Sequence, residues 1–426
     1  MLRGTELRRV VALAATAAMW LALILPASAD VSRRSDLYVP PPNQDARKQI
    51  AQLVSEGRLA DAAGIRDMIR TPQAVWFTAG TPESVQRDVR QTMHRARAKR
   101  SIPVLVAYNI PFRDCAQFSA GGATTVEEYE AWIDGFAAGM GRNRAIVILE
   151  PDGLGIIPWY TSVDGVAEWC QPAEADPATA ASDRFEMLQY AVETLGATGA
   201  NVYLDGTHSA WLNVGDIATR LRDAGVEDAA GFFLNASNYQ FTDNQVAYGS
   251  WISACIEMLA QGAAAADCAN QYWNGGPEGT AIADLLGPWT GVALSSYGVW
   301  SESAPEPELN TSGVEARYAG VEAATHFVVD TSRNGVGPWQ PGDYPDFQDW
   351  CNPPDRGLGL QPTLHTGTEL VDAFLWVKIP GESDGECTRG LGPAGETVDP
   401  EWGIIDPPAG EWFPAMALDL VHNAVE

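Results

Sequence analysis

Six polar residues follow short apolar runs at intervals along the sequence, and five of them are aspartates. They are Asp114, Asp152, Asp205, Asn235, Asp330 and Asp384. A carboxyl group that is kept protonated can donate its proton to a leaving oxygen, while neighbouring carboxylates stabilise positive charge and help to activate water. Aspartates that crowd together raise one another's pKa, which favours a protonated donor near neutral pH.

A single aspartate after a strand can instead cap the next helix. That interpretation does not explain the whole set, because Asp114 adjoins Arg113 and Asp384 lies close to Lys378 and Glu382. Lys378 interrupts an otherwise apolar run, so a buried Lys378 would need Glu382 or Asp384 as its partner. We therefore expect the carboxyl groups to act together.

The sequence contains 15 tryptophans, and many of them lie outside the apolar runs. An indole ring offers a flat apolar face with a polar edge, which suits the C–H face of a pyranose ring. Packing in the core or in loops is the alternative for any one of them. The tryptophans outside the runs include Trp159, Trp169, Trp211, Trp273, Trp339, Trp350 and Trp402.

Seven apolar runs predict β-strands. Most are continuously apolar rather than alternating, which is typical of strands buried on both faces of a parallel sheet. The runs are residues 74–79, 103–110, 145–151, 200–206, 231–237, 326–331 and 373–379.

Amphipathic, helix-like segments separate these runs. Strand and helix alternate throughout, which predicts right-handed crossovers and an α/β fold. The predicted helices include residues 82–98, 126–141, 184–195, 214–224, 244–261 and 312–324, with another near 413–421.

The strand-end polar residues favour a barrel over an open, doubly wound sheet. In a barrel the carboxyl ends of the strands converge on one mouth, whereas in an open sheet they spread along a line. Long stretches at 153–182, 262–294, 334–367 and 386–410 are too long for simple connections, and we expect them to shape a site.

The N-terminus is typical of an export signal. Arg3, Arg8 and Arg9 precede an apolar run at 10–25, and the small residues 27–29 suit a signal peptidase. We predict a signal peptide at 1–29, a secreted protein, and one catalytic domain at 30–426 without a carbohydrate-binding module. A retained membrane anchor is the alternative, although the apolar run is short for a stable span.

The formal net charge of −28 excludes some partners. Nucleic acid and acidic membrane surfaces are repelled by such a field, whereas a neutral polymer is not. The five histidines are scattered, and no pair of cysteines has the spacing of a zinc or redox site. We expect a monomer without metal or cofactor.

Six cysteines lie in the predicted exported part: Cys115, Cys170, Cys255, Cys268, Cys351 and Cys387. An even number in an oxidising compartment favours disulfides, but the number alone leaves many pairings open. The short separation of Cys255 and Cys268 favours a local bridge between them.

Residues 381–385 match the G-x-S-x-G pattern around a nucleophilic serine. That motif requires a helix directly after Ser383, but the residues that follow are rich in Gly and Pro. We therefore interpret the match as a coincidence of composition.

Several ordered blocks resemble glycoside hydrolase family 6, the cellobiohydrolases and endoglucanases. The resemblance covers roughly residues 36–426. The blocks are YNIPFRDC at 108–115, SAGG at 119–122, ILEPDGL at 148–154, YLDGTH at 203–208 with Trp211, LNASNY at 234–239, DTSRNG at 330–335 and WVKIPGESDG at 376–385.

This resemblance implies a distorted, seven-stranded parallel (β/α) barrel that hydrolyses β-1,4-glucosidic bonds with inversion and needs no cofactor. Asp152 resembles the general acid. Asp114 resembles the neighbour that raises the pKa of Asp152 and helps to hold the water, and Asp384 occupies the position of the proposed base, whose role can run through a water chain. The residues that the resemblance places at the glucosyl subsites are Trp76, Tyr108, Asp205, His208, Trp211, Asn235, Trp350, Lys378 and Glu382.

The resemblance also implies the disulfides Cys115–Cys170 and Cys351–Cys387. The length of 386–410 favours a cellobiohydrolase, because chain-end-cutting members use a long loop there as part of a roof. The segment 112–125, which would form the opposing roof, is not extended. The alternatives are an endoglucanase acting on soluble or amorphous glucan, and a non-catalytic glucan-binding protein.

Overall fold

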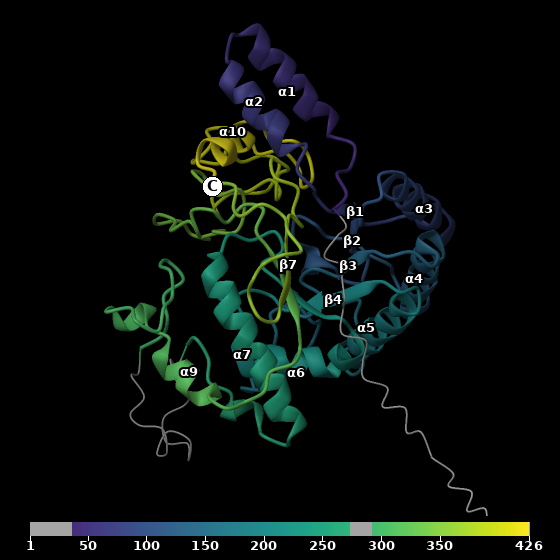
Figure 1. Ribbon diagram of the computed structural model, residues 1–426, viewed down its shortest axis with the longest axis vertical. Coiled ribbons are helices and arrows are strands. Elements are labelled where there is room, and N and C mark those ends of the chain that lie inside the picture. The colour runs from purple at the N-terminus through teal and green to yellow at the C-terminus, as the bar shows by residue number, and fades with distance from the viewer. Residues whose placement is uncertain (1–35, 273–291, 426) are drawn as a thin grey trace, which may run out of the picture.

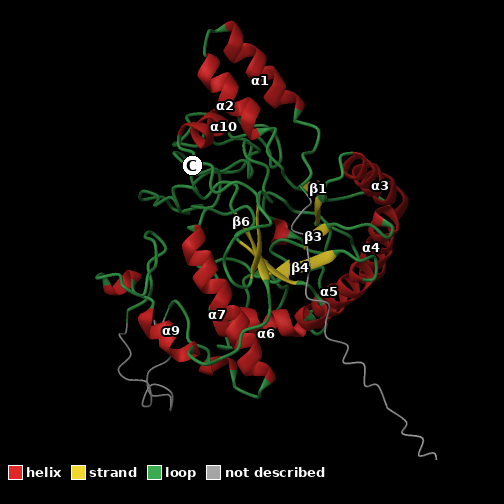
Figure 2. Cartoon of the chain, in the orientation of Figure 1, coloured by secondary structure: helices red, strands yellow, loops and turns green. Residues whose placement is uncertain are grey.

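A computed structural model describes residues 36–272 and 292–425. The predicted signal peptide lies outside the described residues, as does Trp273. Seven parallel strands pair in chain order from β1 to β7, which confirms the seven-stranded α/β fold. Figure 2 shows the strands in yellow near the centre of the molecule, with helices in red around them. The strands are β1 (Val75–Phe77), β2 (Val104–Ala107), β3 (Ile146–Leu149), β4 (Asn201–Asp205), β5 (Gly231–Leu234), β6 (Phe327–Asp330) and β7 (Val371–Leu375).

The strands are apolar throughout because their two faces contact two different cores. Val106 and Ile148 belong to a cluster on one face of the curled sheet, together with Phe233 and Val328. Their chain neighbours, such as Leu149, pack against the helices in the larger cluster. A strand between two apolar layers has no polar face, which explains the continuous runs in the sequence.

The sheet curls so that its first and last strands approach one another. The backbone N–H of Ala74 donates to the carbonyl of Trp376 at 2.9 Å. Beside it, the indole N–H of Trp76 donates to the carbonyl of Val377 at 2.8 Å. The result is a curled half-barrel in which β1 and β7 are linked by isolated hydrogen bonds rather than by a ladder.

Helices cover the outside of the curled sheet (Figure 1). Side-chain caps set several helix starts, as where the Thr81 hydroxyl accepts from the backbone N–H of Ser84 at the start of α3. These helices are α3 (Pro82–Ala98), α4 (Val126–Met140), α5 (Ala180–Gly196), α6 (Val214–Asp223), α7 (Thr242–Ala260) and α9 (Ser312–Tyr318).

Most predicted elements differ from the structure by a few residues at their ends. The helix predicted at 312–324 stops at Tyr318, because Gly320 adopts a left-handed φ of 84° two residues later. The strand predicted at 373–379 is β7, which begins and ends earlier. Its last predicted residues leave the sheet and carry Lys378 into the cavity described below.

A helical hairpin of α1 (Gln44–Ser55) and α2 (Leu59–Met68) was not among the predicted elements. It packs beside α10 (Pro414–His422), so helices from the first and last parts of the described chain lie together (Figure 1). Leu53 and Ile65 share an apolar cluster there with Trp412 and Leu420. This cluster closes the molecule around the chain segment that leads out of β7.

Three disulfides are present, and all three match the predicted pairs. They are Cys115–Cys170, Cys255–Cys268 and Cys351–Cys387. Within residues 36–272 and 292–425, no helix has the length and apolar character needed to cross a membrane.

Candidate active site

A cavity of about 720 Å³ lies at the carboxyl ends of the strands. Ten of the twelve predicted catalytic and substrate-binding residues line it, although they come from segments far apart in the sequence. The predicted residues in its lining are Trp76, Tyr108, Asp114, Asp152, His208, Trp211, Trp350, Lys378, Glu382 and Asp384.

Asp205 and Asn235 do not line the cavity. Asp205, at the end of β4, is buried behind the cavity wall, and its charge raises the pKa of Asp152. The Asn235 amide donates to the carbonyls of Gln240 and Asp330, at 3.3 and 2.9 Å, and so holds the turn after β5. The Asp330 carboxylate accepts from the backbone N–H groups of Ser237 and Lys378, which ties the ends of β5, β6 and β7 together.

Several of these strand ends turn through a left-handed backbone conformation. The φ angles are 58° at Asp114, 63° at Asp152, 59° at Thr207 and 67° at Asn235. Non-glycine residues adopt this region rarely, and Asp and Asn tolerate it best. The turns direct side chains into the mouth of the sheet instead of continuing the strand.

Asp152 is the carboxyl group in the cavity that most strongly favours its protonated form. Burial raises its pKa well above the ordinary range, and the charges of Asp205 and Asp114 raise it further. The Tyr108 hydroxyl beside it opposes the shift only in part. A carboxyl group in this state can donate a proton at neutral pH.

Asp114 lines the same cavity as Asp152, but its pKa is raised less. Burial raises its pKa to about 6, against a hydrogen bond from the backbone N–H of Ser119 and the charge of Arg113. That N–H lies 2.6 Å from the Asp114 carboxylate. Asp114 is therefore largely ionised at neutral pH and can accept a proton.

Asp205 supplies a fixed negative charge behind Asp152. Its carboxylate accepts backbone N–H groups from Leu154, Gly155 and Thr207 at 2.9 to 3.2 Å. Burial raises its pKa to about 6, against these three hydrogen bonds. Because the same turn carries Asp152, the carboxylate both shapes that turn and raises the pKa of Asp152.

Glu150, two residues before Asp152, also binds backbone N–H groups through its carboxylate. It was not predicted as a site residue. It is fully buried and accepts the backbone N–H groups of Asn109 and Ile110 at 2.9 to 3.0 Å. Burial raises its pKa to about 7. Glu150 thereby joins the segment after β2, which carries Asp114, to the segment after β3, which carries Asp152.

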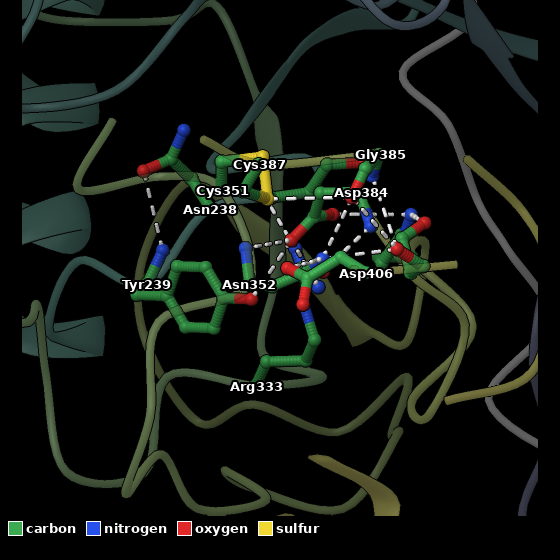
Figure 3. A network of polar contacts seen from close by, with 12 residues as sticks. Asn238, Tyr239, Arg333, Cys351, Asn352, Asp384, Gly385, Cys387 and Asp406 are labelled. Atoms are coloured by element: carbon green, nitrogen blue, oxygen red, sulfur yellow. Dashed lines mark hydrogen bonds and ion pairs between the residues drawn. A yellow bond between two sulfur atoms is a disulfide. The ribbon is translucent and has the colours of Figure 1, made fainter. Parts of the chain in front are cut away.

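Asp384 has the opposite character, and its surroundings are drawn in Figure 3. Its carboxylate lies 2.9 Å from Arg333 Nη1 and 3.1 Å from Lys378 Nζ, so Asp384 is the partner that Lys378 was expected to need. Tyr239 and the backbone N–H of Asn352 also donate to it. Burial alone would raise the pKa of Asp384, but the two cations outweigh it and the pKa lies below the ordinary value.

His208 is held as a neutral ring in the cavity wall. Burial lowers its pKa to about 3. The backbone N–H of Ala210 donates to Nδ1 at 3.2 Å, which places the ring proton on Nε2. His208 can therefore donate a hydrogen bond from Nε2 without carrying charge.

Aromatic rings form much of the remaining wall. Trp76 meets Tyr108 edge to face with centroids 5.6 Å apart, and Trp211 lies 5.6 Å from the His208 ring. Trp169 lines the cavity with 54% of its surface exposed. These rings present apolar faces beside hydrogen-bonding groups, as sugar binding requires.

Some cavity residues were not predicted. Phe118 lies 5.9 Å from Trp350, and Ser237, Asn238 and Asp349 also line the wall. Ser237 and Asn238 come two and three residues after Asn235, so the small and polar residues after β5 were a usable signal. Nothing comparable marks Phe118, which comes from an irregular segment.

Ser383 is a structural residue, in keeping with the sequence interpretation. It is fully buried, and its hydroxyl donates to the carbonyl of Pro407 at 2.7 Å. No helix follows it until α10, and His422 contacts Asp61 instead. The G-x-S-x-G match therefore does not form a nucleophile elbow.

The comparisons with known proteins agree with this geometry. The family profile described as Glycosyl hydrolases family 6 matches residues 32–424. Endoglucanase A of Cellulomonas fimi is 32% identical over 391 residues, which is 92% of this chain and 62% of the relative. A probable 1,4-beta-D-glucan cellobiohydrolase C of Neosartorya fischeri is 30% identical over 357 residues, 78% of this chain and 65% of the relative. The chain thus spans less than two thirds of the length of either relative.

Among solved structures, the endoglucanase Cel6 of Mycobacterium tuberculosis is 32% identical with a TM-score of 0.60. The match covers 91% of this chain and 97% of that one, which was solved with a methyl-cellobiosyl-4-deoxy-4-thio-β-D-cellobioside. Endoglucanase CEL6B of Humicola insolens, 23% identical with a TM-score of 0.60 and coverage of 93% and 98%, supports the fold.

Proposed function

This chain belongs to glycosyl hydrolases family 6, and we propose that it hydrolyses β-1,4-glucosidic bonds of glucans by direct attack of water with inversion. The observation that carries the proposal is the carboxyl group of Asp152 in a cavity with aromatic walls, where burial and the charges of Asp205 and Asp114 raise its pKa well above the ordinary value. The family resemblance and the endoglucanase and cellobiohydrolase relatives support the choice of substrate.

In the proposed reaction Asp152 donates its proton to the glycosidic oxygen as the bond from that oxygen to the anomeric carbon breaks. A water molecule attacks the opposite face of the anomeric carbon and loses one proton. Asp114, with a pKa of about 6, is suited to take up that proton, directly or through a second water. For each bond cleaved, Asp152 donates one proton and Asp114 accepts one proton.

Asp384 acts mainly through its charge. Its carboxylate is paired with Arg333 and Lys378 and its pKa is low, so accepting a proton there is unfavourable. A carboxylate held by so many donors is also a weak nucleophile, which favours attack by water over a covalent intermediate. We propose that Asp384 stabilises the positive charge that develops on the sugar, in place of the base role that the family resemblance implies.

The aromatic and polar residues of the wall bind the chain of glucosyl units. Trp76, Trp211 and Trp350 offer ring faces, and neutral His208 and the carboxylate of Glu382 offer hydrogen bonds. Asn235 contributes by holding the turn that carries Ser237 and Asn238. The net charge of −28 leaves a neutral glucan as the favoured polymer.

For the mode of attack, the length of 386–410 favours chain-end cutting, but its position favours internal cutting. Of this segment only Ala409 and Gly410 line the cavity. The rest folds back on the chain through the Cys351–Cys387 disulfide and the Arg389–Asp399 ion pair. We therefore propose an endo mode, with release of cellobiose from chain ends as the alternative.

Two measurements test this function. The anomer first released from cellohexaose, followed by nuclear magnetic resonance, should be α, and β would exclude inversion. The viscosity of soluble substituted cellulose should fall early relative to the release of reducing ends, and an even decline with mostly cellobiose would favour the exo mode. Cellohexaose that stays intact would favour a non-catalytic glucan-binding protein.

A further inference from the structure

Asn352 directs its backbone N–H and its side-chain amide toward Asp384 and the residues beside it (Figure 3). It is fully buried and adopts a left-handed φ of 40°, next to the Cys351–Cys387 disulfide. Its backbone N–H donates to the Asp384 carboxylate at 3.0 Å, and its side-chain oxygen accepts the backbone N–H of Asp384 at 2.7 Å. Asn352 thus holds Asp384 by both its carboxylate and its main chain.

The side-chain amide of Asn352 extends this hold to both neighbours. Its Nδ2 atom lies 2.9 Å from the Ser383 hydroxyl and 2.9 Å from the Gly385 carbonyl. The three residues from Ser383 to Gly385 are therefore all bound to one side chain. The backbone of Ser383 exchanges hydrogen bonds with Glu411 and Gly410 at 2.8 and 3.0 Å, whereas the backbone N–H of Asp384 donates to the Asn352 side chain.

A third acceptor connects Asn352 to the segment 386–410. The Asp406 Oδ2 atom lies 2.9 Å from Nδ2, while Asp406 Oδ1 is buried without a hydrogen-bond partner within the described residues. Burial first, and then the charge of nearby Asp399, raises the pKa of Asp406 to about 7, against the hydrogen bond from Asn352. The Asn352 carbonyl accepts from Trp402 and Arg389, which come from the same segment.

We propose that Asn352 is a positioning residue for Asp384, fixing its carboxylate through the main chain of residues 383–385 and tying it to the segment 386–410 through Asp406. Arg333 and Lys378 lower the pKa of Asp384, but each reaches the carboxylate through a long side chain. Asn352 contacts both the carboxylate and the main chain of Asp384. The inference rests on the proposed function of Asp384.

A matched control is available in Gln348. Its side-chain oxygen accepts the backbone N–H groups of Thr388 and Arg389 at 2.9 Å, so it holds the same segment without touching Asp384. The Gln348→Ala variant therefore loosens the segment 386–410 alone. The Asn352→Ala variant loosens both the segment and Asp384.

The test compares kcat and KM on cellohexaose for the two variants. Asn352→Ala should lower kcat about 10- to 100-fold with KM within about threefold, because a displaced carboxylate stabilises the charge of the transition state less well. Gln348→Ala should change kcat less than about threefold. An equal loss in both variants, a loss confined to KM, or full activity in folded Asn352→Ala would overturn the proposal.

Asp406→Ala is the second variant, and it keeps the test decisive if Asn352→Ala does not fold. Asp406→Ala should also lower kcat. In the double variant with Asn352→Ala, the fold-loss in kcat should be smaller than the product of the two single fold-losses, because the two residues act through the same contact. An Asp406→Ala variant with unchanged kcat would contradict the link to the segment.

If wild-type enzyme leaves cellohexaose intact, the proposed function fails instead. Amide hydrogen exchange of a peptide containing residues 383–385 then still tests the positioning. It should speed up in Asn352→Ala and not in Gln348→Ala, and equal exchange in the two would overturn the inference.

Discussion

Arg333 Nη1 lies 2.9 Å from Asp384 Oδ2, and almost none of either side chain is exposed. Together with Lys378, this ion pair gives Asp384 a pKa below the ordinary value. We therefore expect Asp384 to remain ionised at neutral pH and to be a poor acceptor for a proton. A low pKa favours an electrostatic role for Asp384 over a role as the base that accepts a proton from water.

Asp384→Asn should lower kcat on cellohexaose about 10²- to 10³-fold, because a fixed charge that stabilises the transition state is lost. Added azide should not restore the rate, since azide replaces an attacking water but not a stabilising charge. In Asp114→Ala, by contrast, azide should restore part of the rate. Recovery of Asp384→Asn by azide would show that Asp384 is the base.

The same variant should also be less stable, by about 3–5 kcal/mol, because Arg333 is left buried beside a neutral amide. Denaturant unfolding measures this loss. Asp372→Asn is the control, since Asp372 pairs with His326 at 2.9 Å near the opposite ends of β6 and β7. A smaller loss there is expected because His326 is partly exposed.

Asp205→Asn should move the alkaline limb of the kcat profile to lower pH. The negative charge of Asp205 helps to raise the pKa of Asp152, so its removal lets Asp152 lose its proton earlier. The profile is measured on cellohexaose between pH 4 and 9. Asp164→Asn, an exposed substitution in the 153–182 stretch, should leave the limb in place, and an equal shift in both variants would refute the assignment.

The strands and the carboxyl cluster could be predicted because their signals are local. A strand buried on both faces must be apolar throughout, and a polar residue directly after it must lie at the mouth of the sheet. Asp152, after β3, is such a residue. The end of β7 was misplaced because Trp376 and Val377 remain apolar and buried after the ladder has ended.

The network around Asn352 could not be predicted in this way. Asn352 and Asp406 are 54 residues apart in stretches without periodicity, and their contact depends on a disulfide and on irregular turns. The α1–α2 hairpin depends likewise on α10, at the other end of the chain. Asp205 was predicted as a substrate-binding residue, but the structure places it behind the wall rather than in the cavity.

Trp169→Ala should weaken the binding of long substrates. Trp169 exposes 54% of its surface at the cavity wall, where a pyranose ring can stack on it. KM for cellohexaose should rise about tenfold, while kcat stays within about threefold. Phe347→Ala is the matched control, since Phe347 is 61% exposed and does not line the cavity, and an equal rise there would rule out a subsite at Trp169.

Glu150→Gln should flatten the dependence of stability on pH. Burial raises the pKa of Glu150 to about 7 from an ordinary value of 4.5. Its contribution to folding is therefore complete below the ordinary value and is lost as the pH rises through 7. Unfolding free energies at pH 5 and pH 8 should differ less in Glu150→Gln than in wild type, whereas Glu193→Gln on the exposed face of α5 should behave as wild type.

The most direct test of the account is the rate of cellohexaose hydrolysis by Asp152→Asn. Asparagine tolerates the left-handed φ of 63° at this position, so the fold should be kept. The account predicts a loss of at least about 10³-fold on cellohexaose, and a much smaller loss on a cellobioside whose leaving group needs no proton. A folded Asp152→Asn enzyme that cleaves cellohexaose within about tenfold of the wild-type rate would contradict it.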